Sequence, residues 1–329
     1  MVRIFLAITM RYSKNEGKIS KKDKIFRFTK SELNCAYERT KLKFLENGKI
    51  HLANPKQLTV YDTENEIFEK IQKAYLKTPI FESLVNPSNF NKLINLVSES
   101  GGKSSSFIFV TTDYKFVIKT ITKHEFFIFK DKLLQIYSRR ILECKSSKLV
   151  RIFALLALPK LDQYVIIMEN LIHKKEESFI FDLKGSKVGR NVKDVDDQLN
   201  PPQGIALKDV NFEQFGYKIP LHPEDKKKEM GILTDDFLVM KNAGIMDYSI
   251  LICIRKNAKL EIGESRLAFV DLAGSVITLG IIDIFQEYNI CKLSETAVKT
   301  LFNKPIEVSS IEPAQYFYRI KEYLSQIFI

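Results

Sequence analysis

Glycine, hydroxyl and lysine residues of the kind that handle phosphate groups are concentrated in the stretch SGGKSSSFIFVTTDYKFVIKT (100–120). Glycines and small hydroxyl residues let backbone N–H groups approach phosphate oxygens. Lys119, on the strand expected to follow, could reach the same phosphates as a point charge. A serine-rich hairpin that carries a surface lysine is the alternative. The candidate nucleotide-binding residues of the hairpin are Gly102, Lys103, Ser104 and Ser106.

The layout of this stretch is closer to a kinase nucleotide site than to a P-loop. In protein kinases a glycine-rich hairpin covers the nucleotide, and a lysine follows on the third strand in the tetrapeptide VAIK. Here FVIK (116–119) occupies the comparable place. GKS at 102–104 resembles the end of a P-loop, but that motif needs a glycine where Val97 stands and continues into a helix. A P-loop is therefore excluded.

Single acids stand beside apolar segments at three further places. A kinase site needs carboxylates for magnesium and for the acceptor hydroxyl. GIMDYSILICI places Asp247 between a helix and a strand, and LGIIDIFQEYN places Asp283 after apolar residues. Asp271 in FVDLAGS competes with Asp283 because it superficially resembles the D-F-G of protein kinases. For each of them, a surface aspartate in a turn is the alternative.

The stretch FIFDLKGSKVGR (179–190) places Asp182, Lys184 and Gly185 directly after an apolar triplet. A strand would hold the carboxylate and the ammonium in fixed geometry, and the glycine would allow close approach of the backbone. Arg190 is a candidate for gripping a phosphate bidentately. A salt bridge to a neighbouring acid is the alternative for this guanidinium.

The elements that must position these residues form a strand-rich middle with one embedded helix, and the remainder mixes strands and helices. This predicts an α+β chain with an antiparallel-sheet N-lobe and a mixed C-lobe. The expected organisation is a basic extension (1–60), an N-terminal lobe (61–170) and a C-terminal lobe (171–329). Expected strands span 107–111, 115–121, 149–158, 163–171, 178–183, 248–254 and 265–272, and expected helices span 63–76, 86–100, 125–142, 236–245 and 313–328.

The composition is that of a soluble globular protein: 329 residues, of which 45% are hydrophobic and 28% charged. Much of the net charge of +11 lies in residues 1–30, where nine Lys or Arg stand against two acids. Such an arm is attracted to polyanions, either nucleic acid or the anionic cytoplasmic leaflet. A merely disordered terminus is the alternative.

Cysteine and histidine usage predicts no disulfide framework and no structural metal. The four cysteines are far apart without C-x-x-C spacing, and the four histidines lack ligand spacing. The apolar segment IFLAITM is too short to span a membrane and lacks the features of a signal peptide. A cytosolic location is the expectation.

Taken in order, FDLKGS, MDYSIL and GIIDIFQEYN resemble motifs of the phosphatidylinositol phosphate kinases, whose members read close to YDLKGS, MDYSLL and GIIDILQ.Y. GKSSSF, FVIKT, VIIMENL, LKDVNF and VSSIEPAQYFYRI resemble further motifs of that family. The resemblance covers about residues 95–329. It implies a two-lobed kinase-like fold that uses ATP and Mg²⁺.

The resemblance also implies a role for each matched residue. Lys119 stands where the family's ATP-phosphate lysine stands, and Asp247 matches the catalytic-loop aspartate that orients the inositol hydroxyl or accepts its proton. Asp283 matches the magnesium-binding aspartate and is preferred to Asp271. The remaining matches are Asp182 and Lys184 in the signature near the phosphates, and Met168 and Asn170 in the inter-lobe hinge.

The segment after Asp283 resembles the family's specificity loop. Glu295 falls on a glutamate typical of the 5-kinases that act on phosphatidylinositol 4-phosphate. Lys292 and Lys299 are the other candidate specificity residues, although Leu293 replaces the second lysine of the family's membrane-facing pair. The chain is most similar to a short phosphatidylinositol 4-phosphate 5-kinase, which would produce the 4,5-bisphosphate.

Several alternatives stay open at this stage. The lipid could carry a 5-phosphate or a 3-phosphate, and the chain could be a phosphoinositide-binding pseudokinase scaffold, since Ser105 replaces a glycine of the family's hairpin. A homodimer is also left open. The expected partner is a phosphoinositide in an anionic membrane, with the protein peripheral on the cytosolic face and no specific nucleic acid bound.

Overall fold

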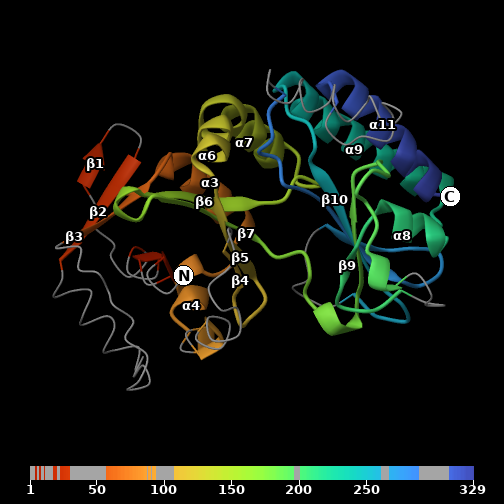
Figure 1. Cartoon of the computed structure of the whole chain (residues 1–329), viewed down its shortest axis with the longest axis horizontal. Helices are drawn as coiled ribbons and strands as arrows, with labels where there is room; N and C mark the ends of the chain where they lie inside the picture. The colour runs from red at the N-terminus through yellow and green to blue at the C-terminus, as the bar shows by residue number, and fades with distance from the viewer. Residues whose placement is uncertain are drawn as a thin grey trace. The chain divides into compact units, whose positions relative to one another are not determined.

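The computed structural model describes residues 4–5, 7–8, 11, 18–20, 23–29, 57–86, 88–89, 91–93, 107–195, 201–260, 267–288 and 311–329. The chain forms two compact units. The first comprises residues 1–126 and 151–170, and the second comprises 127–150 and 171–329. Both units combine a sheet with helices (Figure 1), which confirms the predicted α+β class. No described helix is long and apolar enough to cross a membrane.

The first unit is built on a seven-stranded antiparallel sheet with the order β1-β2-β3-β6-β7-β5-β4. Its strands are β1 (Lys18–Ser20), β2 (Asp23–Thr29), β3 (Gln57–Asp62), β4 (Ile108–Val110), β5 (Phe116–Ile121), β6 (Ile152–Leu158) and β7 (Gln163–Glu169). Its helices are α3 (Asn65–Tyr75), α4 (Ile80–Leu84) and the first part of α6 (Lys123–Ile128), with a 3-10 turn at Pro159–Leu161.

Alternation along β5 separates the two faces of this sheet. Phe116, Ile118 and Thr120 are buried, whereas Val117 and Lys119 are half-buried on the other face. In β6 every residue is buried, and α3 packs against this strand, with the Gln72 amide donating to the Phe153 carbonyl at 2.8 Å. The strand that was expected to carry Lys119 therefore exists, and the lysine projects from the less buried face of the sheet.

The N-terminal segment expected as a basic extension is part of the sheet. β1 and β2 lie wholly within residues 1–60, and β2 pairs with β3, which pairs with β6. Arg11 forms an ion pair with Asp62 at the end of β3, and Phe5 packs edge-on against Phe109 with ring centroids 4.9 Å apart. The described part of this segment therefore continues the first unit and is not a separate arm, which corrects the predicted boundary at residue 60.

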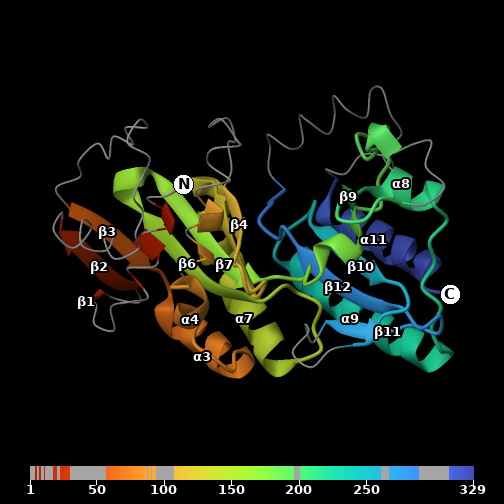
Figure 2. The ribbon, with the colours of Figure 1, turned by 90° about the horizontal axis from the view of Figure 1, so that it is seen from below.

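The second unit contains a five-stranded mixed sheet with the order β11-β12-β10-β8-β9. Its strands are β8 (Phe179–Leu183), β9 (Ala206–Leu207), β10 (Ser249–Arg255), β11 (Ala268–Val270) and β12 (Val276–Ile282), and only the β8–β9 pair is parallel. Its helices are a π-helical turn (Phe129–Leu133), α7 (Leu134–Glu143), α8 (Asp209–Gln214), α9 (Pro223–Asn242) and α11 (Pro313–Ile327), with 3-10 turns at Lys175–Glu177 and Lys193–Val195. Helices α9 and α11 pack side by side on one face of this sheet (Figures 1 and 2).

Residues 127–150 belong to the second unit, although the sequence placed them in a lobe spanning 61–170. Their side chains explain the difference. The ring of Phe129 packs on both Tyr137 and Phe285, with centroids 5.4 Å away in each case. The Tyr137 hydroxyl donates to the Val150 carbonyl at 2.7 Å, which closes the segment on itself.

The carboxylate of Asp236 in α9 fastens this segment to the rest of the second unit. It is fully buried and accepts from Arg140 Nε at 2.7 Å, from Ser147 Oγ at 2.9 Å and from the Lys148 N–H at 2.6 Å. A buried carboxylate of this kind is favourable only while its partners stay in place.

Replacing Asp236 by alanine is expected to lower the free energy of unfolding by about 3 kcal/mol, because Arg140 loses its buried partner. Urea unfolding followed by circular dichroism measures this. The matched control is Asp235→Ala: Asp235 is 62% exposed with its carboxylate 3.5 Å from Arg140 Nη1, and an exposed pair contributes less than about 1 kcal/mol. Equal losses in the two variants would contradict the role of the buried carboxylate.

Candidate functional site

Three neighbouring strands of the second unit bring four of the predicted site residues to one end of the sheet. The register pairs Ile250 of β10 with Leu183 of β8, and Ser249 of β10 with Ile282 of β12. One edge of the sheet therefore holds the end of β8, the start of β10 and the end of β12. The residues at this edge are Asp182, Lys184, Asp247 and Asp283.

Asp247 and Asp283 both have left-handed backbone conformations, with φ of 59° and 57°. Non-glycine residues seldom adopt this region, although Asp tolerates it better than most, and such residues cluster at functional sites. The two aspartates lie in a short interruption of the β10–β12 ladder. Pairing resumes beyond them, where the Met246 N–H donates to the Gln286 carbonyl at 3.0 Å. Both acids are therefore held where the two strands part, with backbone pairing on either side.

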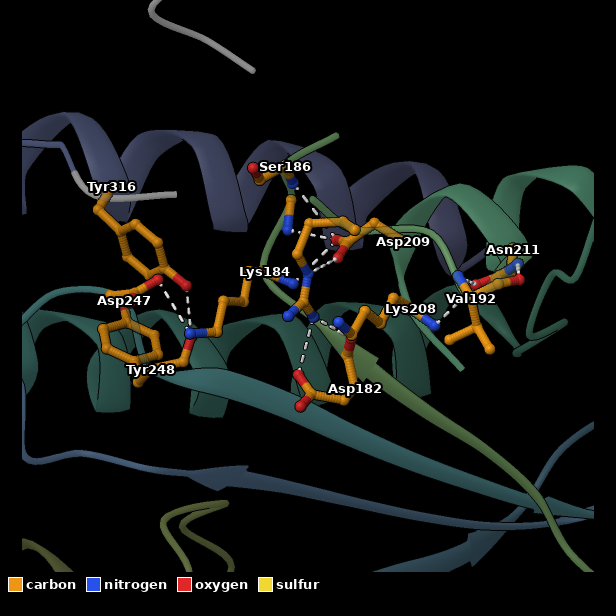
Figure 3. A network of polar contacts seen from close by, with 12 residues as sticks. Asp182, Lys184, Ser186, Val192, Lys208, Asp209, Asn211, Asp247, Tyr248 and Tyr316 are labelled. Atoms are coloured by element: carbon orange, nitrogen blue, oxygen red, sulfur yellow. Dashed lines mark hydrogen bonds and ion pairs between the residues drawn. The ribbon is translucent and has the colours of Figure 1, made fainter. Parts of the chain in front are cut away.

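Lys184 and Asp247 form an ion pair across this edge. Lys184 Nζ lies 2.9 Å from Asp247 Oδ1, and the two side chains are 16% and 19% exposed (Figure 3). The atoms are in contact but are not aligned as a hydrogen bond. The ammonium thus fixes the place of the Asp247 carboxylate, whose Oδ1 is buried while the side chain as a whole stays partly exposed.

The turn after β8 is built around a buried carboxylate that sequence analysis did not predict for the site. Asp209 Oδ1 accepts the backbone N–H groups of Lys184 at 2.9 Å, Gly185 at 2.7 Å and Ser186 at 3.3 Å (Figure 3). Asp209 has no exposed surface. It belongs to the motif LKDVNF, which marked the family resemblance but indicated no role for this residue.

Arg190 completes this arrangement and does not face outward. Its Nε donates to Asp209 Oδ2 at 2.7 Å, and its Nη2 donates to Asp182 Oδ1 at 2.9 Å and to the Asp182 carbonyl. The residue is 9% exposed. Burial by itself lowers the pKa of Arg190, but the charges of Asp209 and Asp182 outweigh it and the pKa is raised. The structure shows the salt bridges that were the alternative for Arg190, and the phosphate grip stays a prediction.

Backbone contacts hold the same region together. The Val210 N–H donates to the Arg190 carbonyl at 3.0 Å, and the buried Asn211 accepts the Val192 N–H at 2.9 Å. Helix α8 is therefore tied to the chain at Arg190 and at Val192, two residues later. Asp209, at the start of that helix, is placed by these contacts.

Gly185 serves a different purpose from the one predicted. Its φ of 62° is left-handed, and a Cβ there would lie 3.6 Å from Arg319 Cγ and 3.6 Å from Ile320 Cδ1 of α11. These are ordinary contact distances, so the left-handed φ, and not a lack of space beside helix α11, favours glycine here. The turn that follows Asp182 and Lys184 thus lies against that helix.

Asp271, the competitor of Asp283, lies at the other end of β12. Its carboxylate accepts the Ser275 N–H at 2.7 Å, and its own N–H donates to the Ser275 carbonyl at 3.0 Å, which closes the β11–β12 turn. The seven residues of β12 separate the two acids, a distance of about 20 Å at 3.3 Å per residue. Only Asp283 lies at the edge that holds Asp247.

In the first unit, Lys119 and Met168 share the less buried face of the sheet. Lys119 pairs with Ile166 of β7, and Val117 pairs with Met168, so the two predicted nucleotide residues lie on adjacent strands. Both are half-buried. This face offers an apolar surface with one ammonium, which suits a nucleotide base and its phosphates.

Asn170, also predicted to bind nucleotide, is buried and supports a turn instead. Its Nδ2 donates to the Tyr114 carbonyl at 2.8 Å, and its N–H donates to the Lys115 carbonyl at 3.0 Å. Its side chain thus fixes the β4–β5 hairpin that carries Lys119. Its side chain therefore supports the hairpin, and its contact with a nucleotide stays a prediction.

Seven predicted site residues lie outside the described residues: Gly102, Lys103, Ser104 and Ser106 of the hairpin, and Lys292, Glu295 and Lys299 of the specificity segment. Within the described ranges, no group of three or more His, Cys, Asp or Glu side chains could hold a metal ion. Mg²⁺ commonly takes only one or two carboxylates and completes its shell with nucleotide phosphates and water. The half-buried Asp283, at the sheet edge beside Asp247, fits such a site.

Comparison with known proteins identifies the family of the chain. The family model for phosphatidylinositol-4-phosphate 5-kinase matches residues 89–273 and 264–327. The chain belongs to this family. The match includes Lys119, the DLKGS turn and both left-handed aspartates, so the resemblance predicted from the motifs is confirmed.

Named relatives differ in the lipid that their names specify. A phosphatidylinositol 4-phosphate 5-kinase of Plasmodium falciparum is 31% identical over 209 residues, 56% of this chain and 12% of the relative. A 1-phosphatidylinositol 3-phosphate 5-kinase of Saccharomyces cerevisiae is 28% identical over 68% of this chain and 10% of the relative. A phosphatidylinositol 5-phosphate 4-kinase of Danio rerio is 24% identical over 69% of this chain and 68% of the relative. The chain spans only a small part of the first two relatives.

Replacing Asp209 by alanine is expected to destabilise the protein by about 3 kcal/mol, because three backbone N–H groups and Arg190 lose a buried acceptor. Urea unfolding followed by circular dichroism measures the change. Glu213→Ala on the same helix is the control: Glu213 is 42% exposed, and its pair with Lys187 is a surface contact. A loss for Asp209→Ala no larger than for Glu213→Ala would show that the turn does not depend on the carboxylate.

Proposed function

We propose that the protein is an ATP-dependent lipid kinase that phosphorylates the inositol ring of a phosphatidylinositol monophosphate. The observation that carries the proposal is the pair of left-handed aspartates, Asp247 and Asp283, at one sheet edge, with Lys184 in ion contact with the first. Family membership supports the same reaction class.

In this proposal the residues of the second unit act on the inositol hydroxyl. Asp247 orients the hydroxyl and accepts its proton as the oxygen attacks the terminal phosphorus of ATP in line. The bond from that phosphorus to the bridging oxygen breaks, and ADP leaves with the oxygen. The Lys184 ammonium, 2.9 Å from the Asp247 carboxylate, opposes the negative charge of the transferring phosphoryl group. Asp209 and Arg190 hold the backbone that carries Lys184 and Asp182.

The nucleotide and its metal ion have candidate residues of their own. Lys119 would contact the phosphates of ATP, and the apolar face next to it, with Met168, would take the base. Asp283 would hold Mg²⁺, which neutralises phosphate charge when it is bound.

For the lipid we propose phosphatidylinositol 4-phosphate, converted to the 4,5-bisphosphate. The support is Glu295, at a position where 5-kinases of the 4-phosphate typically carry a glutamate, together with the name of the Plasmodium relative. We further propose peripheral binding to the cytosolic face of an anionic membrane. The net charge of +11 favours such a surface.

The test is phosphate transfer from labelled ATP to liposomes that contain the 4-phosphate, 5-phosphate or 3-phosphate lipid. Asp283→Asn is expected to reduce turnover at least about 100-fold, because it removes the carboxylate charge at the proposed metal position. Asp271→Asn is the matched control from the same β11–β12 hairpin, and it should keep turnover within about twofold, since its site is a distant turn.

The outcomes separate the alternatives. Conversion of only the 5-phosphate or 3-phosphate lipid would overturn the proposed substrate and keep the lipid kinase. No turnover on any lipid, with liposome binding intact, would favour the pseudokinase scaffold. Equal losses in Asp283→Asn and Asp271→Asn would remove the proposed metal role of Asp283.

Lys119→Ala is expected to lower kcat/KM for ATP at least about tenfold, because the nucleotide phosphates lose a charge-assisted contact. Initial rates at varied ATP and saturating lipid measure this. Lys115→Ala is the control. Lys115 directly precedes β5, its side chain is 56% exposed, and its Nζ lies 3.8 Å from Asp113 Oδ2. If the two variants lose the same amount, the effect is not specific to the position of Lys119.

A further inference from the structure

Helix α11 contacts the backbone next to Asp247 through one hydroxyl group. The hydroxyl of Tyr316 donates to the carbonyl of Tyr248, the residue that follows Asp247 (Figure 3). Both tyrosines are buried, and their rings meet edge to face with centroids 4.7 Å apart. Tyr316 is 68 residues from Tyr248 in the chain, so this contact exists only in the folded protein.

The backbone at Asp247 needs such support. A left-handed conformation costs an L-residue roughly 1–2 kcal/mol, and it persists only where the surroundings determine it. On the N-terminal side, the Met246 N–H is held by the Gln286 carbonyl at 3.0 Å. On the C-terminal side, Tyr248 precedes the first residue of β10, and its carbonyl is held by Tyr316. Asp247 thus lies between two fixed peptide groups.

The Tyr316 ring is itself fixed by its neighbours. The Arg319 guanidinium, one turn further along α11, lies 4.8 Å from the Tyr316 ring centroid. On α9, Phe237 stacks against Tyr248 with centroids 5.8 Å apart. Since α9 and α11 pack together, the hydroxyl is aimed at the carbonyl by a buried aromatic layer between two helices and the sheet.

The hydroxyl keeps its proton. Burial raises the pKa of Tyr316 well above its ordinary value, and the nearby Asp247 carboxylate raises it further. A neutral tyrosine is a hydrogen-bond donor. Tyr316 is therefore the donor in its contact with the Tyr248 carbonyl.

We propose that Tyr316 is a positioning residue for phosphate transfer: its hydroxyl holds the Tyr248 carbonyl and thereby keeps Asp247 in the left-handed conformation that presents its carboxylate. The inference rests on the proposed kinase function. Through the hydroxyl oxygen of Tyr316, helix α11 thus controls the backbone geometry of Asp247.

Tyr316→Phe removes only that oxygen and retains the ring packing. We expect kcat for lipid phosphorylation to fall roughly 10- to 100-fold, because small displacements of a reacting group have effects of that size. KM for ATP and for lipid should stay within about threefold, since Tyr316 contacts neither ligand in this scheme. Hydrogen exchange should accelerate at residues 245–250 and stay unchanged at β11 and at the first unit.

Tyr217→Phe is the matched control. Its ring packs against Phe179 and Phe181, and its hydroxyl is buried without a hydrogen-bond partner among the described residues. This variant loses a buried hydroxyl from the same unit and should keep kcat within about twofold.

The results separate this inference from the proposed function. An unchanged kcat for Tyr316→Phe in an active wild-type enzyme would overturn the inference and leave the kinase intact. Exchange that accelerates across the whole second unit, with both KM values altered, would also overturn it, because it would indicate general loosening. A wild-type protein without turnover on any lipid would reject the kinase function, and unchanged exchange at 245–250 would then reject the positioning role independently.

Discussion

The carboxylate of Asp209 is shared between the backbone of the DLKGS turn and the side chain of Arg190, and the geometry of the sheet edge follows from it. Three N–H groups converge on one oxygen, and the guanidinium binds the other. Buried polar groups need hydrogen-bond partners. This requirement fixes the turn, Arg190 and the start of α8 in one arrangement relative to one another. Lys184 belongs to that turn, and its ammonium forms the ion pair with Asp247.

A second constraint is the interruption of the ladder between β10 and β12. Two left-handed aspartates occupy it, and the backbone pairs again on either side. Strain of this type is stable only inside a rigid frame, which here consists of the central strand β10, buried at every position, and the helices α9 and α11. The unit thus combines a firm core with two acids held in conformations that they would not adopt alone.

In the first unit, too, polar contacts fix the backbone that carries a candidate site residue. Asn170 and Asp113 fasten the β4–β5 hairpin: Asn170 holds the Tyr114 carbonyl, and Asp113 accepts from Thr111 Oγ1 at 2.6 Å and from the Lys115 N–H at 3.2 Å. The hairpin is therefore a rigid support for Lys119. Asn170, which the sequence assigned to nucleotide binding, helps here to fix the hairpin that carries the Lys119 ammonium.

The local sequence pattern by itself determined the strands around Lys119 and Asp247, the apolar run before Asp283 and the order of the motifs. Strand periodicity and an acid directly after an apolar run can both be read from adjacent residues. The local pattern underestimated α9, whose first half is polar and carries no apolar stripe, and which begins at Pro223 instead of 236. The tertiary structure alone decided the rest. Arg190 meets Asp209 across 19 residues, and Tyr316 meets Tyr248 across 68, through strand register and helix packing. Such partners are set by the burial of distant surfaces against one another, and no local pattern contains that information.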